Sequence, residues 1–262
     1  MNKEYTLTVF GCRGSYFVSG EHFDEYGGLS SCYILNKDDY ALVIDCGTGL
    51  YNAEKLLASC KKIDVIFTHM HYDHILGLLY GAVFPKDADV NFYGTFKKWR
   101  GDSTIRDIAE APYWPYVPNF GKFNEIENNG YEFKLNDIVI TAYPANHPNE
   151  STLYSLQVNN KKIAILFDME HDDKYDLSFA KDADLAFYDG MYDDETYEQT
   201  KGYGHSTWQE GCRLATKLNI KKMIITHHSP FNNDIVLREL ENKAKKLNGN
   251  SLFCRAGDVY II

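Results

Sequence analysis

Thr68-His69-Met70-His71-Tyr72-Asp73-His74 directly follows the apolar run Ile63-Asp64-Val65-Ile66-Phe67, and it holds four side chains that can bind metal. The apolar run predicts a strand, and the polar segment predicts a tight turn into a helix. His69 and His71 are two residues apart and therefore point to one side, while Asp73 and His74 point to a second place nearby. The pattern predicts a two-metal site. The alternative is a surface loop with four unrelated polar residues.

The ligand types indicate which metals this site would hold. Imidazole nitrogen combined with a carboxylate oxygen is typical of zinc, manganese or iron sites, whereas calcium and magnesium prefer oxygen ligands alone. We therefore expect two divalent ions, with Zn²⁺ favoured over Mn²⁺ and Fe²⁺.

Composition limits the class of partner. The chain has 262 residues, 44% of them hydrophobic, which is ample for a core, and we expect a single domain over 1–262. Its 27 basic and 37 acidic residues give a net charge of −10, which argues against binding of long nucleic acid. Bound divalent cations would reverse this sign locally, so an anionic small substrate remains compatible.

The cellular location is predicted from what the sequence lacks. A strand pattern begins near the first residue, without a charged and then apolar leader, and no apolar run approaches the length of a membrane span. The six cysteines are scattered, with no Cys-x-x-Cys pair, as expected for reduced thiols. We expect a cytoplasmic protein with no membrane contact, in the host cytoplasm if the gene is carried by a phage.

β-branched and aromatic runs recur along the chain, with helical patterns between them. Strands are predicted at 5–10, 31–35, 40–44, 63–67, 90–93, 137–143, 153–158, 162–167, 185–188, 222–225 and 259–262, and helices at 51–60, 207–218 and 235–247. Early strands follow one another as hairpins, and later strands alternate with helices. This order predicts an α/β fold, an αββα sandwich of two mixed sheets packed face to face with helices on both outer faces.

Polar motifs follow several of these strands. Asp45-Cys46-Gly47-Thr48-Gly49, the histidine cluster, Asn146-His147-Pro148, Phe167-Asp168-Met169 and Thr226-His227 each come after a strand-like run. Loops on a rigid scaffold commonly carry function, so we expect these motifs to gather at one edge of the sheets.

The segment 96–132 differs from the rest of the chain. It contains Ala111-Pro112-Tyr113-Trp114-Pro115-Tyr116-Val117-Pro118-Asn119-Phe120-Gly121, where three prolines and four aromatics disfavour a regular helix. We interpret 96–132 as an aromatic and proline-rich insertion. It could cap the site, form a dimer contact, or pack as a surface loop on its own domain.

Taken together, the motifs resemble the metallo-β-lactamase superfamily and, within it, the phosphodiesterase branch of tRNase Z, phosphonate-pathway cyclic phosphodiesterases and cyclic-nucleotide phosphodiesterases, including phage anti-Pycsar enzymes. The resemblance spans nearly the whole chain. It implies that one metal is bound by His69, His71 and His147, the other by Asp73, His74 and His227, and that Asp168 bridges them. It also implies a homodimer.

Each implied role has a structural alternative. His147 precedes Pro148 and could be a turn residue, and Asp168 could cap a loop. His228 could replace its neighbour His227 as the ligand, although the resemblance favours His227 and assigns His228 to packing or to support of the ligands. Asp45 occupies the family's Asp-x-Gly-x-Gly position, which implies that it orients ligand imidazoles.

A further motif, Gly202-Tyr203-Gly204-His205-Ser206-Thr207, resembles the Gly-His-Ser-Thr loop of the phosphodiesterase branch. The resemblance implies that His205 meets the substrate phosphate and protonates the leaving oxygen. Ser206 or Thr207 could also cap the following helix. We expect Asp73 and His205 to be the catalytic residues, with hydroxide held between the metals attacking phosphorus.

The substrate prediction depends on the segment 96–132. tRNase Z enzymes of this branch carry a basic arm, whereas this segment is aromatic, and together with the net charge this favours a small phosphodiester over RNA. We expect a 3′,5′-cyclic mononucleotide, with Tyr113, Trp114, Tyr116 and Phe120 available to stack on the base. The alternatives are a tRNase Z-like endonuclease and a ligand-binding protein without turnover. A redox role is a further alternative. Diiron oxygen reductases that resemble this fold carry glutamate where this chain has His71, which argues against that role.

Two further motifs resemble the branch. Gly11-Cys12-Arg13-Gly14-Ser15 is similar to its amino-terminal signature, where Arg13 would either neutralise phosphate or make a structural loop contact. Glu170 and His171 follow Asp168 in an Asp-x-Glu-His pattern, where they would support the metal site or pack a turn.

Overall fold

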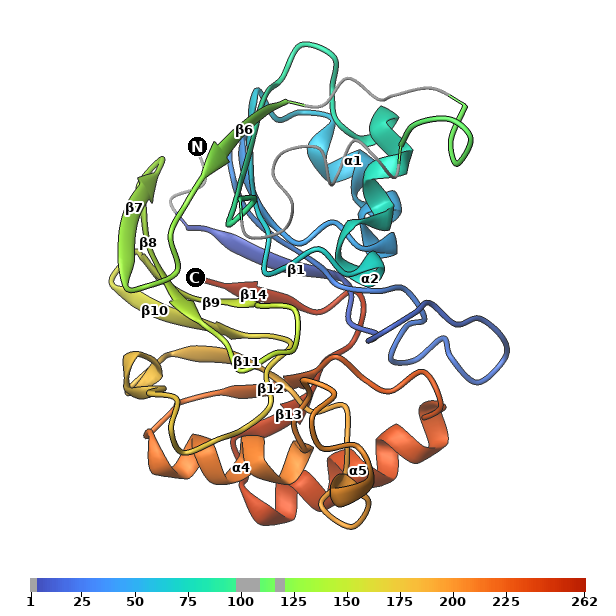
Figure 1. The fold of residues 1–262 in the computed structure, drawn as a ribbon, viewed down its shortest axis with the longest axis vertical. Coiled ribbons are helices and arrows are strands. Elements are labelled where there is room, and N and C mark those ends of the chain that lie inside the picture. Colours follow the sequence, from blue (N-terminus) through green and yellow to red (C-terminus); the bar gives the residue numbers. More distant parts are fainter. Residues whose placement is uncertain (1–3, 98–108, 116–120) are drawn as a thin grey trace.

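The computed structural model describes residues 4–97, 109–115 and 121–262, and within them the chain forms two seven-stranded sheets. The first sheet has the order β14-β1-β2-β3-β4-β5-β6 and the second the order β13-β12-β11-β10-β9-β8-β7. Figure 1 shows the sheets packed against each other, with helices outside. The predicted αββα sandwich is confirmed.

The strands have the following bounds: β1 Thr6–Gly11, β2 Cys32–Lys37, β3 Tyr40–Ile44, β4 Lys62–Ile66, β5 Asp89–Gly94, β6 Lys122–Glu125, β7 Tyr131–Leu135, β8 Ile138–Pro144, β9 Thr152–Val158, β10 Lys161–Leu166, β11 Leu185–Asp189, β12 Met223–Thr226, β13 Ser251–Phe253 and β14 Val259–Ile261. In the first sheet β14, β1, β2 and β3 pair antiparallel, and in the second sheet β7, β8, β9 and β10 do so; the remaining neighbours in each sheet pair parallel. The carboxyl ends of β3 and β4 therefore point the same way, as do those of β10, β11 and β12.

The helices cover the two outer faces. On the first sheet lie η1 (Thr48–Ala53), α1 (Glu54–Leu57), α2 (Tyr72–Ile75) and η2 (Leu76–Val83); on the second lie α4 (Trp208–Lys217) and α5 (Asp234–Leu247), while η3 (Ser178–Ala180) and η4 (Tyr197–Gln199) lie in connecting loops. Asparagine or threonine caps both long helices: Thr207 accepts from the backbone N–H of Glu210, and Asn233 from that of Val236. Each described helix is too short or too polar to cross a membrane.

Three buried clusters fill the spaces between these layers. One lies between the sheets and includes Leu7, Ile44, Ile140 and Ile165. The others lie between each sheet and its own helices. All six cysteines are buried and unpaired.

Several elements differ from the sequence-based prediction. The helix predicted at 51–60 is reduced to the 3₁₀ turn η1 and the four-residue α1. The short strands β6, β7 and β13 escaped prediction. β6 and the start of β7 fall inside the segment 96–132, where each forms the edge of a sheet, so part of the expected insertion belongs to the two sheets.

Cross-sheet hydrogen bonds join the two sheets beside the histidine cluster. The Tyr154 hydroxyl of β9 donates to the carbonyl of Phe67 at 2.6 Å, and the backbone N–H of Thr152 donates to the carbonyl of Thr68 at 2.9 Å. The segment that follows β4 is thereby fixed against the second sheet.

Candidate metal centre

The candidate site lies where several strands end. The strand-end residues are Asp45 after β3, His69 to His74 after β4, His147 after β8, Asp168 after β10, Asp189 at the end of β11 and His227 after β12. Asp45, Asp168 and His227 have positive φ angles of 57°, 42° and 56°. Non-glycine residues rarely adopt this left-handed conformation, and such strained positions concentrate at functional sites.

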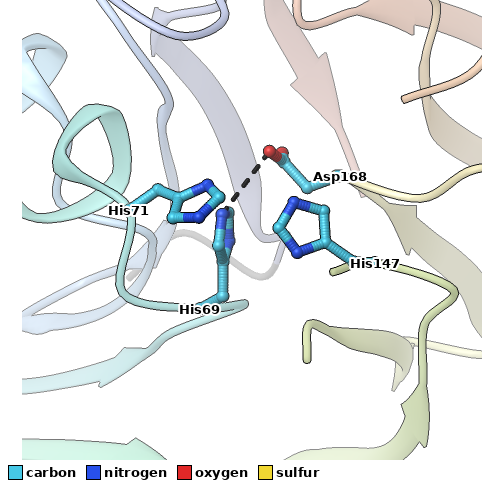
Figure 2. A group of neighbouring side chains, drawn as sticks. All are labelled: His69, His71, His147 and Asp168. Atoms are coloured by element: carbon cyan, nitrogen blue, oxygen red, sulfur yellow. Dashed lines mark ion pairs between the residues drawn. The ribbon is translucent and has the colours of Figure 1, made fainter. Parts of the chain in front are cut away.

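One group of ligand atoms, here called position A, comprises His69, His71, His147 and Asp168. Its four atoms lie within 4.8 Å of one another. Figure 2 shows the three imidazole rings and the Asp168 carboxylate converging on one point, and the Asp168 Oδ2 lies 3.6 Å from the His69 Nε2. Three imidazoles and one carboxylate match a four-coordinate site for a zinc-like ion.

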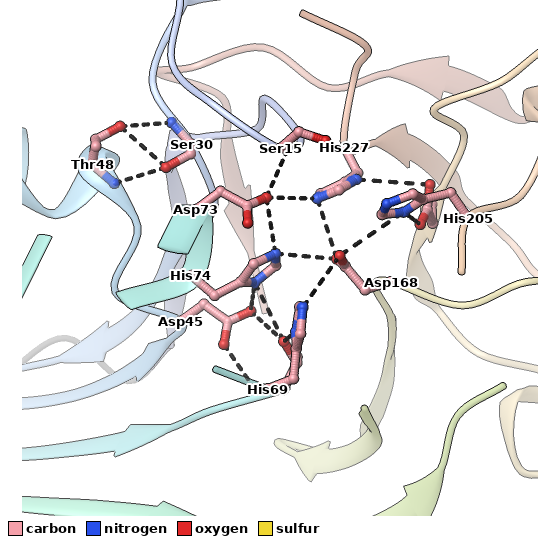
Figure 3. A network of polar contacts seen from close by, with 12 residues as sticks. Ser15, Ser30, Asp45, Thr48, His69, Asp73, His74, Asp168, His205 and His227 are labelled. Atoms are coloured by element: carbon pink, nitrogen blue, oxygen red, sulfur yellow. Dashed lines mark hydrogen bonds and ion pairs between the residues drawn. The ribbon is translucent and has the colours of Figure 1, made fainter. Parts of the chain in front are cut away.

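A second group, here called position B, comprises Asp73, His74, Asp168 and His227, again within 4.8 Å of one another. The Oδ1 of Asp168 lies 3.2 Å from the His74 Nε2 and 3.3 Å from the His227 Nε2 (Figure 3). The Asp73 Oδ2 lies 3.3 Å and 3.2 Å from the same two nitrogens. Asp168 therefore turns one oxygen to each position, as a bridging carboxylate does.

The unsatisfied polar atoms at this centre fit two cations. Within the described residues, both carboxylate oxygens of Asp168 and the Nε2 atoms of His69, His74 and His147 are buried without a hydrogen bond. Buried polar groups without partners are rare, because each costs the free energy of its lost hydration. Divalent cations at positions A and B would satisfy all five atoms.

Asp45 and Thr68 hold the ligand imidazoles from behind. The Oδ2 of Asp45 lies 2.7 Å from the His74 Nδ1, and its carboxylate accepts hydrogen bonds from the backbone N–H and the hydroxyl of Thr68, both at 2.8 Å. The Thr68 hydroxyl lies 3.1 Å from the His69 Nδ1. A carboxylate at Nδ1 presents Nε2 to the metal, so Asp45 occupies the orienting place expected for it.

The imidazoles of position A are favoured in their neutral form. Burial and the neighbouring imidazoles together lower the pKa of His69, His71 and His147, although Asp168 opposes them, and the resulting pKa of His147 is about 4. Neutral imidazole is the form that binds metal. His71 is only partly buried, and its Nε2 lies 2.8 Å from the side-chain amide of Asn149.

Position B has the opposite electrostatics. Burial opposes protonation of His227, but Asp168, Asp189 and Asp73 outweigh it and raise its pKa to about 9. Burial likewise opposes protonation of His74, and its carboxylate neighbours raise its pKa well above the usual value. This concentration of negative charge is the environment that a divalent cation requires.

His205 lies beside both positions, and Asp189 fixes its orientation. The His205 ring stacks on that of His227 at 4.9 Å and lies 6.1 Å from that of His147. Its Nδ1 is 2.8 Å from the Oδ2 of Asp189, whose Oδ1 is 3.9 Å from the His227 Nδ1. Sequence reasoning missed Asp189, although it ends an apolar strand just as Asp168 follows one.

The loop that carries His205 is held by Glu170. The Glu170 carboxylate accepts from the Tyr197 hydroxyl at 2.8 Å and from the backbone N–H of Gly202 at 2.8 and 3.0 Å. Gly204 has φ +88°, and a Cβ there would stand 2.3 Å from the His147 ring. Glycine is therefore needed at 204 for the loop to approach position A, and Glu170 has the supporting role suggested by its motif.

Of the remaining predicted residues, His228, Tyr113 and Trp114 lie within the part of the chain that the structure describes. His228 is buried, with Nε2 2.8 Å from the Cys254 carbonyl and its ring stacked on Phe253, so it packs the interior and contacts no ligand atom among the described residues. Tyr113 is exposed, and the backbone N–H groups of Tyr113 and Trp114 donate to the Glu110 carbonyl. Tyr116 and Phe120 lie outside the described residues.

Comparison with known proteins agrees with the resemblance. The family described as "Beta-lactamase superfamily domain" matches residues 40–228. The probable metallo-hydrolase YhfI of Bacillus subtilis is 24% identical, over 97% of this chain and 98% of its own. Its crystal structure gives a TM-score of 0.74 at 20% identity, over 99% of this chain and 100% of its own.

Two further relatives carry named activities. A ribonuclease Z of Clostridium acetobutylicum is 24% identical, over 86% of this chain and 88% of its own. A crystal structure described as a new diphosphatase from the PhnP family gives a TM-score of 0.72 at 22% identity, over 98% of this chain and 97% of its own. The solved structures establish the fold, and the family match covers most of the sequence. The chain belongs to the β-lactamase superfamily and has the metallo-β-lactamase fold.

Proposed function

We propose that this protein is a dinuclear metal-dependent phosphodiesterase that hydrolyses a small phosphodiester, a 3′,5′-cyclic mononucleotide in particular. The observation that carries the proposal is Asp168, which divides its two oxygens between positions A and B while His205 lies beside both. Two cations with a protonatable imidazole at their side are the equipment of phosphoester hydrolysis.

The proposed cofactors are two divalent ions, Zn²⁺ in the first place. When bound, such a pair lowers the pKa of water and offsets the charge of the phosphate in the transition state. The ligands would be the three imidazoles of position A, the imidazoles of His74 and His227 and the Asp73 carboxylate at position B, and the Asp168 carboxylate between the two positions. Asp45 keeps His74 in the tautomer that presents Nε2.

His205 is the proposed general acid. Because its Nδ1 faces Asp189 at 2.8 Å, its Nε2 is the ring nitrogen left to hold a proton for the departing ester oxygen. Asp189 holds the imidazole in this orientation. The Asp73 carboxylate accepts a hydrogen bond from the Ser15 backbone N–H at 2.7 Å. Its Oδ2 also lies 3.2 Å from the His227 Nε2, so Asp73 helps to orient that imidazole.

The overall charge supports a small substrate. With 27 basic against 37 acidic residues, the chain offers little attraction to a long polyanion. A small substrate with one negative charge can be attracted by the two metal ions alone and needs no basic surface.

The homodimer implied by the family resemblance remains a prediction, which light scattering of the purified protein would check.

RNA processing is the second candidate. It is favoured by the ribonuclease Z of C. acetobutylicum, which matches 86% of this chain. Under this alternative the same metal centre would cut a precursor tRNA rather than a cyclic nucleotide.

A substrate panel separates the two candidates. Metal-loaded wild type and His69→Ala would be given 2′,3′-cyclic and 3′,5′-cyclic mononucleotides, cyclic dinucleotides and a precursor tRNA, with product followed by chromatography. His22→Ala is the matched control, because His22 lies in an exposed loop. We expect turnover of a cyclic mononucleotide by wild type and by the control, but not by His69→Ala. Cleavage of the tRNA with every cyclic nucleotide left intact would replace our proposal by the second candidate.

A further inference from the structure

Three aromatic side chains in the loops that follow β1 and β12 are unusually exposed. Tyr16, Phe17 and Phe231 have 48%, 56% and 81% of their surface in solvent. Tyr16 and Phe231 come from loops far apart in sequence, yet their rings meet edge to face, with centroids 6.2 Å apart and planes at 86°. A neighbouring group of large apolar rings in water commonly marks a binding surface.

Both loops are attached directly to the metal centre. The backbone N–H of Ser15 donates to the Asp73 Oδ2 at 2.7 Å, so the Cα of Tyr16 lies no more than about 8 Å from a position B ligand atom. Phe231 follows His227 by four residues. Gly14 lies against the His227 ring, where a Cβ would stand 2.5 Å away. The ring pair is therefore at the rim of position B.

Arg13 holds the two loops together. Its side chain is fully buried; its Nε donates to the Gly27 carbonyl at 2.7 Å, and its Nη1 donates to the carbonyls of Ser229 and Asn232 at 3.1 and 2.7 Å. Of the two roles considered from sequence, Arg13 has the structural one. Its three bonds clamp the loop of Phe231 to the loop of Tyr16, so the exposed ring pair stands on a fixed base.

We propose that Tyr16 and Phe231 form the stacking platform for the nucleobase of the substrate, an inference that rests on the proposed function. A phosphate at positions A and B leaves the ribose and base to extend over the rim. Each base has a π face that stacks on an aromatic ring without regard to its hydrogen-bond pattern. Because 81% of the Phe231 surface is exposed, its ring offers the open face, and the Tyr16 ring supports it.

The test removes each ring and measures binding of the base separately from that of the phosphate. Phe231→Ala and Tyr16→Ala would be assayed with a 3′,5′-cyclic mononucleotide and with the matching cyclic ribose phosphate that lacks a base. Phe17→Ala is the control, since Phe17 is an exposed aromatic of the same loop outside the ring pair. Phe231→Trp should restore function, because it returns an aromatic face.

Stacking on one aromatic ring changes affinity by about 5- to 150-fold. We therefore expect Phe231→Ala to raise the KM for the nucleotide by about 10- to 100-fold with kcat little changed, and to leave the KM for the abasic compound unaltered. Tyr16→Ala should act in the same direction but less. Equal effects on both compounds, or an equal effect of Phe17→Ala, would overturn the platform.

Binding measurements distinguish failure of the platform from failure of the proposed function. Isothermal titration of the metal-loaded protein with adenosine 5′-monophosphate and with ribose 5-phosphate needs no turnover. If wild type hydrolyses no phosphodiester but Phe231→Ala weakens only the nucleotide, the platform stands and the proposed function falls. If Phe231→Ala changes neither titration, or converts a dimer to a monomer in light scattering, the ring pair is not a base platform.

Discussion

Positions A and B share Asp168 but differ in charge and exposure. Position A adds three imidazoles whose pKa values are lowered, and one of them, His71, is partly exposed. Position B adds the Asp73 carboxylate and two buried imidazoles whose pKa values are raised. The two halves of one centre are thus built on different principles: neutral donors at A, of which only His71 is partly exposed, and concentrated negative charge at B. We expect B to hold its ion more tightly.

The largest effect should come from removing what the two positions share. Asp168→Asn keeps the size of the side chain but removes the charge that both positions share and replaces one of the two acceptor oxygens by an amide nitrogen. Several kcal/mol of transition-state stabilisation depend on the pair of ions, so kcat/KM should fall on the order of 1,000-fold or more. Plasma emission spectrometry should find less than two metal ions per chain. Full occupancy with unchanged activity would remove Asp168 from the bridging place.

Removing one ligand from each position tests the difference between them. His147→Ala opens A and His227→Ala opens B, and each should lower activity on the order of 100-fold. Each variant should retain about one ion. In a competition with a chelator, removing the ion left at B in His147→Ala should require at least about tenfold more chelator than removing the ion left at A in His227→Ala. The reverse order would show that charge does not set the affinity here.

A smaller effect is expected from the carboxylate behind His205. Asp189→Asn weakens the orientation of His205 and should lower kcat by about 10- to 100-fold, because partners behind an active group commonly contribute that much. Metal content should change little. Asp193→Asn is the control: Asp193 bonds Trp208 and Gln209 but contacts no residue of either position among those described. Equal losses in both variants would indicate damage to the fold.

The smallest effect on activity should come from Glu241, a buried carboxylate of α5 outside the centre. Burial raises its pKa, but hydrogen bonds from Arg255 and from the backbone N–H of Phe253 outweigh this and lower it from 4.5 to about 2. A depressed carboxyl pKa contributes stability that is complete above about pH 5 and is lost as the pH falls to about 2.

Glu241→Gln should therefore lower the free energy of unfolding at pH 7 by about 3 kcal/mol, and by progressively less below pH 5. Urea titrations at several pH values would measure this, with the exposed Glu239→Gln of the same helix as control. Activity and metal content should stay near those of wild type at low urea. Loss of metal in Glu241→Gln would mean that metal affinity depends on charges elsewhere in the domain and not only on the ligands of positions A and B.

The sequence could predict those parts of the centre that lie in short local motifs. His69, His71, Asp73 and His74 lie within six residues, and Asp168 and His227 directly follow apolar strands. Asp189 has the same placement, but a lone carboxylate at a strand end is also an ordinary turn residue, and only the fold brings it to His205. The ring pair at the rim of position B could not be predicted from the sequence either, because the exposure of Tyr16 and Phe231 depends on how the two loops pack around Arg13.

The fold followed the same division. β-branched and aromatic runs predicted most strands. The missed strands β6, β7 and β13 all lie at sheet edges, where weak patterns suffice. The segment 96–132 was interpreted from its prolines and aromatics, which say what it cannot form but not where its ends pair.

The bonds from Tyr154 to Phe67 and from Thr152 to Thr68 have a consequence for the order of folding. They cross from one sheet to the other beside ligands that are 158 residues apart in the chain, from His69 to His227. Such distant segments meet late, after loop-closure entropy has been overcome. A peptide carrying only the histidine cluster should therefore bind metal weakly, and uptake of the second ion by refolding protein should report the moment when the sandwich closes.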